Sequence, residues 1–260
     1  MTAVYGGRRI PVPPWVYGAG GLVVLLVVWE VLGLTVFASS RAVPPPTAIL
    51  RQLATDGFGF YWPNVKTTLR EAGLGWLWGN LIAIVLAVAF VQIPLVERAL
   101  LQLALASYCL PVIAIGPVLA VLFSGDTSKV ILAALSVIFT TLIGAQVGLR
   151  GADRTSLDLV RAYGGGSWSE LWRVRLRSSL PSLFAGLRIA APAAMLGAII
   201  GEYLGAESGL GVAMINSQQS LAVERTWGIA LVATALSGAA YGLTALVGRL
   251  LTPWAPRTPR

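Results

Sequence analysis

The sequence predicts an all-α membrane protein with about six transmembrane helices. Of its 260 residues, 56% are hydrophobic and 12% are charged, whereas soluble domains carry about 45–50% apolar and about 25% charged residues. The apolar residues come in blocks of about 20 or more, the length that a helix needs to cross about 30 Å of hydrocarbon at about 1.5 Å per residue. A single large soluble domain is therefore excluded as the fold class.

Six apolar blocks are long enough to span a bilayer. The first could be a signal peptide, since Arg8 and Arg9 precede it, but it is longer than the apolar core of such a peptide and five more blocks follow. We therefore expect a retained helix, with a tail over residues 1–14, a transmembrane domain over 15–254 and a second tail over 255–260. The six expected spans are residues 15–37, 73–91, 99–123, 130–149, 183–204 and 227–251.

The basic residues predict the orientation of these spans. Of the 19 Arg and Lys residues, 13 fall on the side that holds both chain ends and 6 on the other side. Cytoplasmic loops are enriched in Arg and Lys, so both termini are expected in the cytoplasm. The net charge of +8 then reports inner loops, and we expect no nucleic-acid partner. On the outer side, an amphipathic stretch around Ile49, Leu50 and Leu53 predicts a short surface helix.

The residue inventory excludes most catalytic chemistry. The chain has no histidine, and its one cysteine, Cys109, can form neither an internal disulfide nor a CxxC metal site. Its two lysines, Lys66 and Lys129, do not follow a glycine, so no Walker A phosphate loop is present. We therefore expect no catalytic residue and no metal site. Energy for any active process must come from a partner protein or from a gradient.

The longest and most charged inner loop, residues 150–182, predicts a helical hairpin. Apolar residues at helical spacing lie on both sides of the glycine run 164–166. Ser167 and Glu170 have the spacing of a capping box, in which each side chain bonds the other residue's amide. Pro181 is expected to end the loop. Such a hairpin suits docking to another protein, although its arginines could instead contact only anionic lipid.

The spacing within this loop resembles the EAA motif of ABC-importer permeases, which reads E-A-A, three residues, G, nine residues, I-x-L-P. Residues 158–160 stand at E-A-A and Gly164 stands at the glycine. Val174 and Leu176 stand at the isoleucine and the leucine, whereas Arg177 replaces the proline. The acid is shortened to aspartate and both alanines are enlarged, so the motif is degenerate although its spacing is kept.

Other segments carry the same resemblance over roughly residues 42–254. They look like segments of permeases of the nitrate, sulfonate, taurine and pyrimidine-precursor type. The matching segments are P-P-P-T-A at 44–48, L-P and G-P at 110–111 and 116–117, G-E-Y-L-G-A-x-S-G-L-G at 201–211, and N-S-Q-Q at 216–219.

This resemblance implies a type I ABC importer permease architecture with a cytoplasmic coupling-helix hairpin, in the bacterial inner membrane. The implied partners are a cytoplasmic ABC ATPase dimer, a second permease copy or paralogue, an extracytoplasmic solute-binding protein and membrane lipid. ATP and Mg would be bound by the ATPase, and no cofactor by this chain. The solute would be small, and anionic or heterocyclic.

The hairpin residues take their implied roles from the same resemblance. Asp158 and Arg161 would make charged contacts with the ATPase, Gly164 would permit the turn, and Trp168 with Leu171 would supply an apolar anchor. Aromatic residues and arginine are favoured at the centres of interfaces. The full set expected to couple to the ATPase is Asp158, Arg161, Gly164, Ser167, Trp168, Glu170, Leu171 and Arg173.

Inside the membrane, a few residues are candidates for the translocation path. Pro111 and Pro117 can kink the third span, and Tyr108 lies nearby. Glu202 near the outer end of the fifth span could line an outer gate, because acids in hydrocarbon usually face protein or water. Ordinary tolerance of proline in helix bundles, and a Glu202 carboxylate that merely reaches the interface, remain open alternatives.

Two other classes of function stay open on the sequence alone. A membrane-embedded lipid-modifying enzyme usually needs clustered acids, and Asp153 and Asp158 are not spaced for such a site. A gradient-driven secondary transporter would leave the hairpin without a role, and the two halves of the chain do not match as inverted repeats would. Small-residue repeats over 197–205 and 238–242 predict close helix packing within the subunit.

Overall fold

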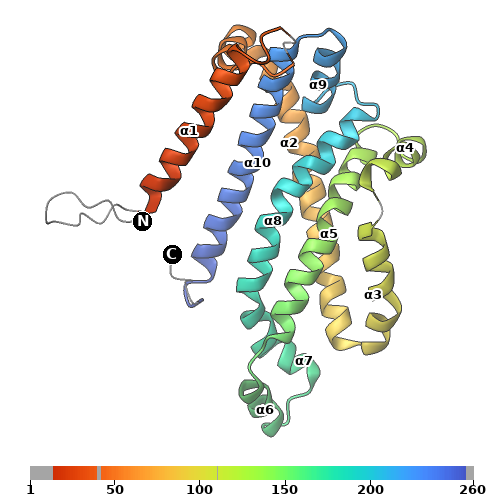
Figure 1. The fold of residues 1–260 in the computed structure, drawn as a ribbon. Helices are drawn as coiled ribbons and strands as arrows, with labels where there is room; N and C mark the ends of the chain where they lie inside the picture. Colours follow the sequence, from red (N-terminus) through yellow and green to blue (C-terminus); the bar gives the residue numbers. More distant parts are fainter. Residues whose placement is uncertain (1–13, 40–41, 110, 256–260) are drawn as a thin grey trace, which may run out of the picture.

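The computed structural model of the protein describes residues 14–39, 42–109 and 111–255, and most of these residues are helical (Figure 1). The expected tails fall almost entirely outside the described residues. In chain order the helices are α1 Pro14–Leu34, α2 Pro46–Gln92, α3 Pro94–Cys109, α4 Val112–Leu122, α5 Thr127–Arg150, α6 Arg154–Ala162, α7 Ser167–Glu170, a π-helical segment Leu171–Arg175, α8 Leu176–Tyr203, α9 Leu210–Gln219 and α10 Val223–Leu251.

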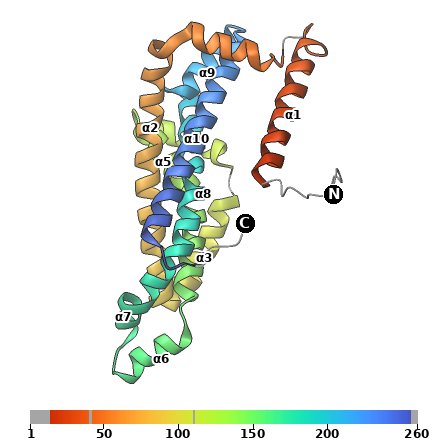
Figure 2. The same ribbon diagram turned by 90° about the vertical axis from the view of Figure 1, so that its left-hand side faces the viewer.

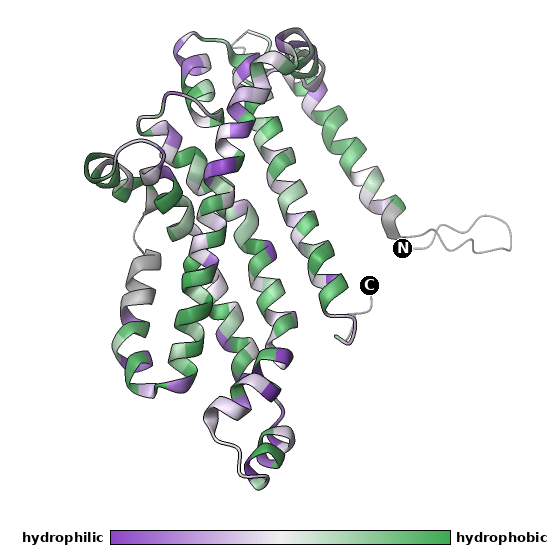
Figure 3. Ribbon diagram, turned by 180° about the vertical axis from the view of Figure 1, so that it is seen from behind, coloured by the Kyte–Doolittle hydropathy of each residue, from purple (hydrophilic) through white to green (hydrophobic). Residues whose placement is uncertain are grey.

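Helices α2, α5 and α8 pack side by side to form the centre of the bundle, with α10 along α8 and α2 (Figures 1 and 2). The short helices α6 and α7 form a hairpin at one end of the bundle, and α9 lies at the opposite end. We call these the hairpin end and the α9 end. The flanks of the bundle are predominantly apolar (Figure 3), as expected of a surface that faces lipid. Five helical stretches of the described residues are long and apolar enough to cross a membrane.

Glycines bring the backbones of the central helices into close contact. A Cβ added at Gly79 of α2 would lie 2.6 Å from the carbonyl oxygen of Ala134 in α5. A Cβ at Gly148 of α5 would lie 2.7 Å from the carbonyl oxygen of Ser179 in α8. Without a hydrophobic driving force between helices in lipid, such close van der Waals packing is what holds a bundle together.

Helix α1 stands apart from the bundle and joins it at one end (Figures 1 and 2). The Trp29 indole N–H donates to the carbonyl oxygen of Pro44 at 3.1 Å, and its ring lies 5.5 Å from that of Trp227. The Glu30 carboxylate accepts from the Thr47 hydroxyl at 2.6 Å. Glu30, the acidic residue of the first span, therefore binds α1 to the start of α2.

The second and third expected spans differ from the structure. Helix α2 already starts at Pro46, contains the expected surface helix around the buried Ile49, and bends at Gly57, whose φ of 67° breaks the helix before the membrane part begins. The third span was expected to be one kinked helix, and this prediction is wrong: α3 ends at Cys109 and α4 begins after Pro111. Proline cannot donate a backbone hydrogen bond and disfavours helical conformation in the preceding residue, so the helix is interrupted here.

The inner loop is also shorter than expected. Pro181 does not end it, because the helical stretch from Ser167 runs without a break through Pro181 and Pro192 to Tyr203. Neighbouring helices and local adjustments allow proline within membrane helices. The region between α8 and α10 contains the short helix α9. Of the small-residue repeats, Gly197 packs closely on α5, whereas nothing in the described chain lies within 4 Å of a Cβ at Gly238.

These contacts predict different responses to the same substitution. Gly148→Ala would press a methyl group against the Ser179 backbone, and overpacking of this kind costs about 1–3 kcal/mol. We expect a lower thermal unfolding midpoint for the purified protein in detergent. Gly238→Ala is the matched control, because its Cβ meets open space and alanine favours helix by about 0.5–1 kcal/mol. Equal midpoints for the two variants would contradict the close α5–α8 packing.

Candidate functional site

The hairpin begins with a well-capped helix. The Asp153 carboxylate accepts from the backbone N–H and the hydroxyl of Ser156, each at 2.9 Å, and so caps α6. The bond from the Ser156 amide holds the pKa of the Asp153 carboxyl below its usual range. Leu157 is the buried residue of α6, so one face of this short helix packs inward and the other stays exposed.

Two glycines close the turn between α6 and α7. The backbone N–H of Gly164 donates to the carbonyl oxygen of Arg161 at 2.8 Å, and that of Gly165 donates to the carbonyl oxygen of Val160 at 2.9 Å. Gly164 has a φ of +79°, a conformation that other residues adopt at a cost. A Cβ at Gly165 would lie 2.8 Å from the carbonyl oxygen of Val160. The turn therefore requires glycine at two successive positions, for two different reasons.

Glu170 ties the two arms of the hairpin together. Its carboxylate accepts from the Arg161 Nε at 2.6 Å and from a terminal nitrogen of Arg175 at 3.1 Å, and Arg175 also donates to the carbonyl oxygen of Leu149 at 3.2 Å. The Arg161 bond, with help from Arg175, holds the pKa of Glu170 below its usual range although burial raises it. One carboxylate thus joins α6, α7 and the end of α5.

The expected capping box between Ser167 and Glu170 is wrong. The residue at the N-cap position, just before α7, is Gly166, and no side chain caps the helix there. The amide of Glu170 donates to the Gly166 carbonyl oxygen at 3.0 Å, while its carboxylate turns toward two guanidinium groups. Unlike a backbone amide, the guanidinium groups of Arg161 and Arg175 carry a positive charge, so the carboxylate pairs with them.

The two expected apolar anchors differ in exposure. Trp168 is 62% exposed, whereas Leu171 is 1% exposed and packs within the subunit against Leu149. Leu171 is therefore not available to a partner surface, and that part of the expectation is wrong. Trp172, which is not among the coupling residues expected from the sequence, is 68% exposed. Its spacing of four residues from Trp168 places both side chains on one helix face, and this spacing was the available signal.

The remaining coupling candidates lie on the surface of the hairpin. Ser167 and Arg173 are exposed, and Asp158 pairs with Arg161 at 3.3 Å while its side chain stays 70% exposed. Between the hairpin and the end of α5 lies a cavity of about 430 Å³, whose wall includes four guanidinium groups. They belong to Arg150, Arg154, Arg161 and Arg175.

Among the candidates for the translocation path whose side chains the structure describes, Glu202 lies on α8, whereas the two prolines lie just before and inside α4. Pro111 immediately precedes α4, Pro117 lies exposed inside it, and the side chain of Tyr108 lies outside the described part of the structure. Glu202 is 1% exposed, and its carboxylate faces α2 and the start of α9 through Thr68 and Gly211. It does not reach the surface of the subunit.

The molecule is a bundle of membrane-length helices with a charged hairpin at one end (Figure 1). Comparison with known proteins identifies the class of protein to which it belongs. Residues 79–255 match the family described as "Binding-protein-dependent transport system inner membrane component". A probable ABC transporter permease protein of Haemophilus influenzae is 31% identical over 84% of this chain and 89% of the relative.

Two further relatives carry more specific names. The riboflavin transport system permease protein RibX of Chloroflexus aurantiacus is 32% identical over 90% of this chain and 88% of the relative. The formylaminopyrimidine transport permease protein ThiX of Halalkalibacterium halodurans is 30% identical over 72% of this chain and 75% of the relative.

The chain therefore belongs to the family of binding-protein-dependent transport system inner membrane components. It is the permease subunit of an ABC importer, a non-catalytic membrane subunit whose ATP is hydrolysed by partner subunits. The resemblance seen in the sequence is confirmed, and the two other classes, a lipid-modifying enzyme and a gradient-driven transporter, are not supported.

The Glu170 bridge predicts how firmly the hairpin is held. Glu170→Gln should raise amide exchange at Gly164 and Gly165 at least about tenfold, since hydrogen bonds to charged groups contribute about 1.5–3 kcal/mol. In the unmodified chain, protection should persist above the ordinary carboxyl pKa and fall as the pH drops through the lowered pKa of Glu170. Hydrogen exchange with mass spectrometry measures both effects.

Asp158→Asn is the matched control for this measurement. Its ion pair with the same Arg161 is solvent-exposed, and exposed pairs contribute about 0–1 kcal/mol. If Asp158→Asn and Glu170→Gln loosen the turn equally, the buried bridge does not hold the hairpin.

Proposed function

We propose that the hairpin over residues 155–175 is the element that couples this permease to its ATPase. The observation that carries the proposal is the exposed pair Trp168 and Trp172 on one face of a hairpin that Glu170 holds rigid. Exposed tryptophans at the tip of a membrane bundle are costly in water unless a partner covers them. Interfaces favour aromatic anchors surrounded by polar groups, which is the composition of this surface.

The proposed mechanism is mechanical. When the ATPase subunits close on ATP, they displace the hairpin, and the hairpin moves as a unit because Glu170 bridges Arg161 and Arg175. Asp158 and Arg173 contribute charged contacts at its rim, and Gly164 keeps the turn tight. ATP and Mg are bound by the ATPase, and this chain binds no cofactor.

We further propose that the hairpin end faces the cytoplasm of a bacterial cell and that the chain sits in its inner membrane. The start of α1 and the end of α10 both point toward the hairpin end (Figures 1 and 2), which supports cytoplasmic termini. The excess of basic residues on the same side supports this orientation. A second permease copy or paralogue would complete the path, and a solute-binding protein would dock at the α9 end.

The solute is proposed to be small, and anionic or heterocyclic. The names of the relatives support the heterocyclic class, since one is called a riboflavin and another a formylaminopyrimidine transport permease.

The coupling role predicts the effect of two substitutions on ATPase binding. Trp168→Ala should weaken co-purification with the cognate ATPase at least about tenfold, because interface hot spots contribute about 2 kcal/mol or more. Gly164→Pro should abolish it, because proline is confined to a φ of about −65° and the turn needs +79°. Both variants should still insert into membranes.

Phe58→Ala is the control for this experiment, because Phe58 is a 73% exposed aromatic residue near the opposite end of the bundle. It should bind the ATPase as the unmodified chain does. Undiminished binding by both hairpin variants, or solute uptake by vesicles that contain only this chain, would refute the coupling role.

A further inference from the structure

Side chains from two other helices bind the first backbone amides of α9. The amides at the start of a helix have no partner within it and need an acceptor elsewhere. Here the three successive N–H groups of residues 209–211 each find one on α2 or α8. Gly209 donates to Asn64 Oδ1 at 3.1 Å, Leu210 to Thr68 Oγ1 at 2.9 Å, and Gly211 to Glu202 Oε2 at 2.6 Å.

Glu202 is the central member of this arrangement. Its second oxygen accepts from the Thr68 hydroxyl at 2.5 Å, so Thr68 donates to Glu202 and accepts from Leu210. A buried carboxylate is costly unless such donors surround it, and Glu202 is 1% exposed. The positive end of the α9 dipole favours a negative charge at this position. Glu202 therefore holds α9 through hydrogen bonds.

The loop that connects α8 to α9 does not by itself fix the position of α9. The connecting residues include Gly205 and Gly209, both with a φ of +130°, where glycine is least restricted. A Cβ at Gly209 would overlap the Glu202 carboxyl group, and one at Gly211 would lie 2.6 Å from the Ile199 carbonyl oxygen. The glycines thus allow α9 to approach Glu202 closely, and the carboxylate fixes its position.

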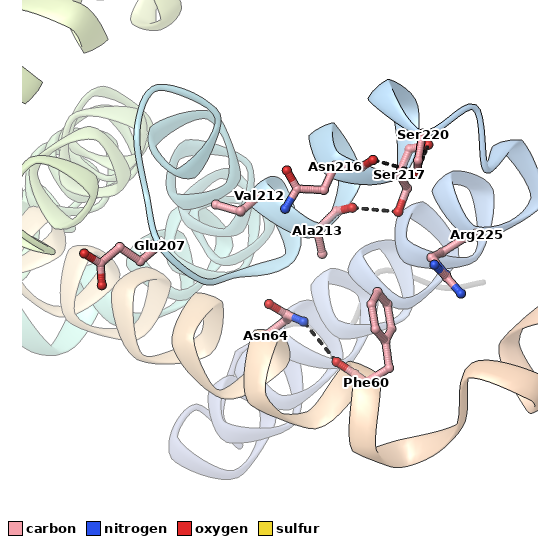
Figure 4. A pocket seen from close by; sticks show the side chains of 9 residues that line it. All are labelled: Phe60, Asn64, Glu207, Val212, Ala213, Asn216, Ser217, Ser220 and Arg225. Atoms are coloured by element: carbon pink, nitrogen blue, oxygen red, sulfur yellow. Dashed lines mark hydrogen bonds between the residues drawn. The ribbon is translucent and has the colours of Figure 1, made fainter.

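Glu202 lies at the far end of the helical stretch that carries the hairpin. This stretch is unbroken over Ser167–Tyr203, and 37 residues at about 1.5 Å per residue give about 55 Å. Helix α9 borders a cavity of about 210 Å³ together with α2 and α10 (Figure 4). Asn216 and Ser217 of α9, Asn64 of α2 and Arg225 of α10 line it.

We infer that Glu202, supported by Thr68, is a positioning residue that transmits displacement of the hairpin helix to α9 and thereby sets the width of this cavity. This inference rests on the proposed coupling role of the hairpin. In this role Glu202 holds the wall of the cavity, in place of lining the translocation path itself. The hairpin and α9 become the two ends of one mechanical element.

The test uses the chain in complex with its cognate ATPase, reconstituted in liposomes, with Cys109→Ala as the background. Gln219→Cys on the exposed end of α9 reports movement through its rate of labelling by a membrane-impermeant maleimide. The rate is compared between the nucleotide-free complex and the complex trapped with ATP and vanadate. We expect the rate to change at least about fivefold, the lower range of typical allosteric coupling.

Glu202→Gln and Thr68→Val should reduce this change to less than about twofold while ATPase association stays at the unmodified level. Gln keeps the size of Glu but places an N–H₂ donor against a donor, and Val keeps the shape of Thr without its hydroxyl. Thr68→Ser restores the hydroxyl and should restore the change in labelling. This rescue separates positioning from a general loss of packing.

Each other outcome overturns the inference. Glu202→Gln and Thr68→Val complexes that retain the full nucleotide-dependent change would show that α9 moves without this contact. Equal labelling of the unmodified complex in both states would show that α9 does not follow the hairpin. If Glu202→Gln fails to fold, the comparison of Thr68→Val with Thr68→Ser decides. Failure of the coupling role itself is distinct, because Trp168→Ala and Gly164→Pro would then bind the ATPase as the unmodified chain does.

Discussion

One continuous helical stretch, Ser167–Tyr203, carries a buried carboxylate near each end, and the bonds of these two groups organise the subunit. Glu170 is 5% exposed and Glu202 is 1% exposed. A carboxylate that leaves water must be surrounded by donors, so each one draws other elements toward it. Glu170 is bonded to α6 and, through Arg175, to the end of α5, and Glu202 is bonded to α2 and to the start of α9. The first group lies in the hairpin, and the second lies beside the start of the helix that borders the 210 Å³ cavity.

Between the two ends, close backbone packing keeps this helix against its neighbours. Gly148 and Gly197 allow α5 and α8 to approach until a methyl group would overlap the other backbone. Packed interiors respond to force by shifting as units, because they have little free volume to absorb strain. A helix that is held along its length and tied at both ends is therefore suited to carry displacement from the hairpin to α9.

Much of this architecture was predictable from local sequence patterns. Apolar blocks of membrane length indicated the spans, and the glycine run before Ser167 indicated the hairpin turn. The break of the third span was not predicted, because a proline can kink a helix or end it, and its neighbours decide which. Likewise, Ser167 and Glu170 have the spacing of a capping box, but Arg161 and Arg175 bind the carboxylate instead.

The sequence by itself determined the fold class, an all-α membrane protein, from an apolar chain without histidine, phosphate-binding loop or metal motif and with a charged hairpin between membrane spans. These properties depend on composition and on residues close together in the chain. Only the tertiary structure decided that Leu171 is buried while Trp172 is exposed, and that Glu202 binds the amides of α9. The partners of these side chains lie on other helices, and their free energy comes from contacts that no local pattern contains.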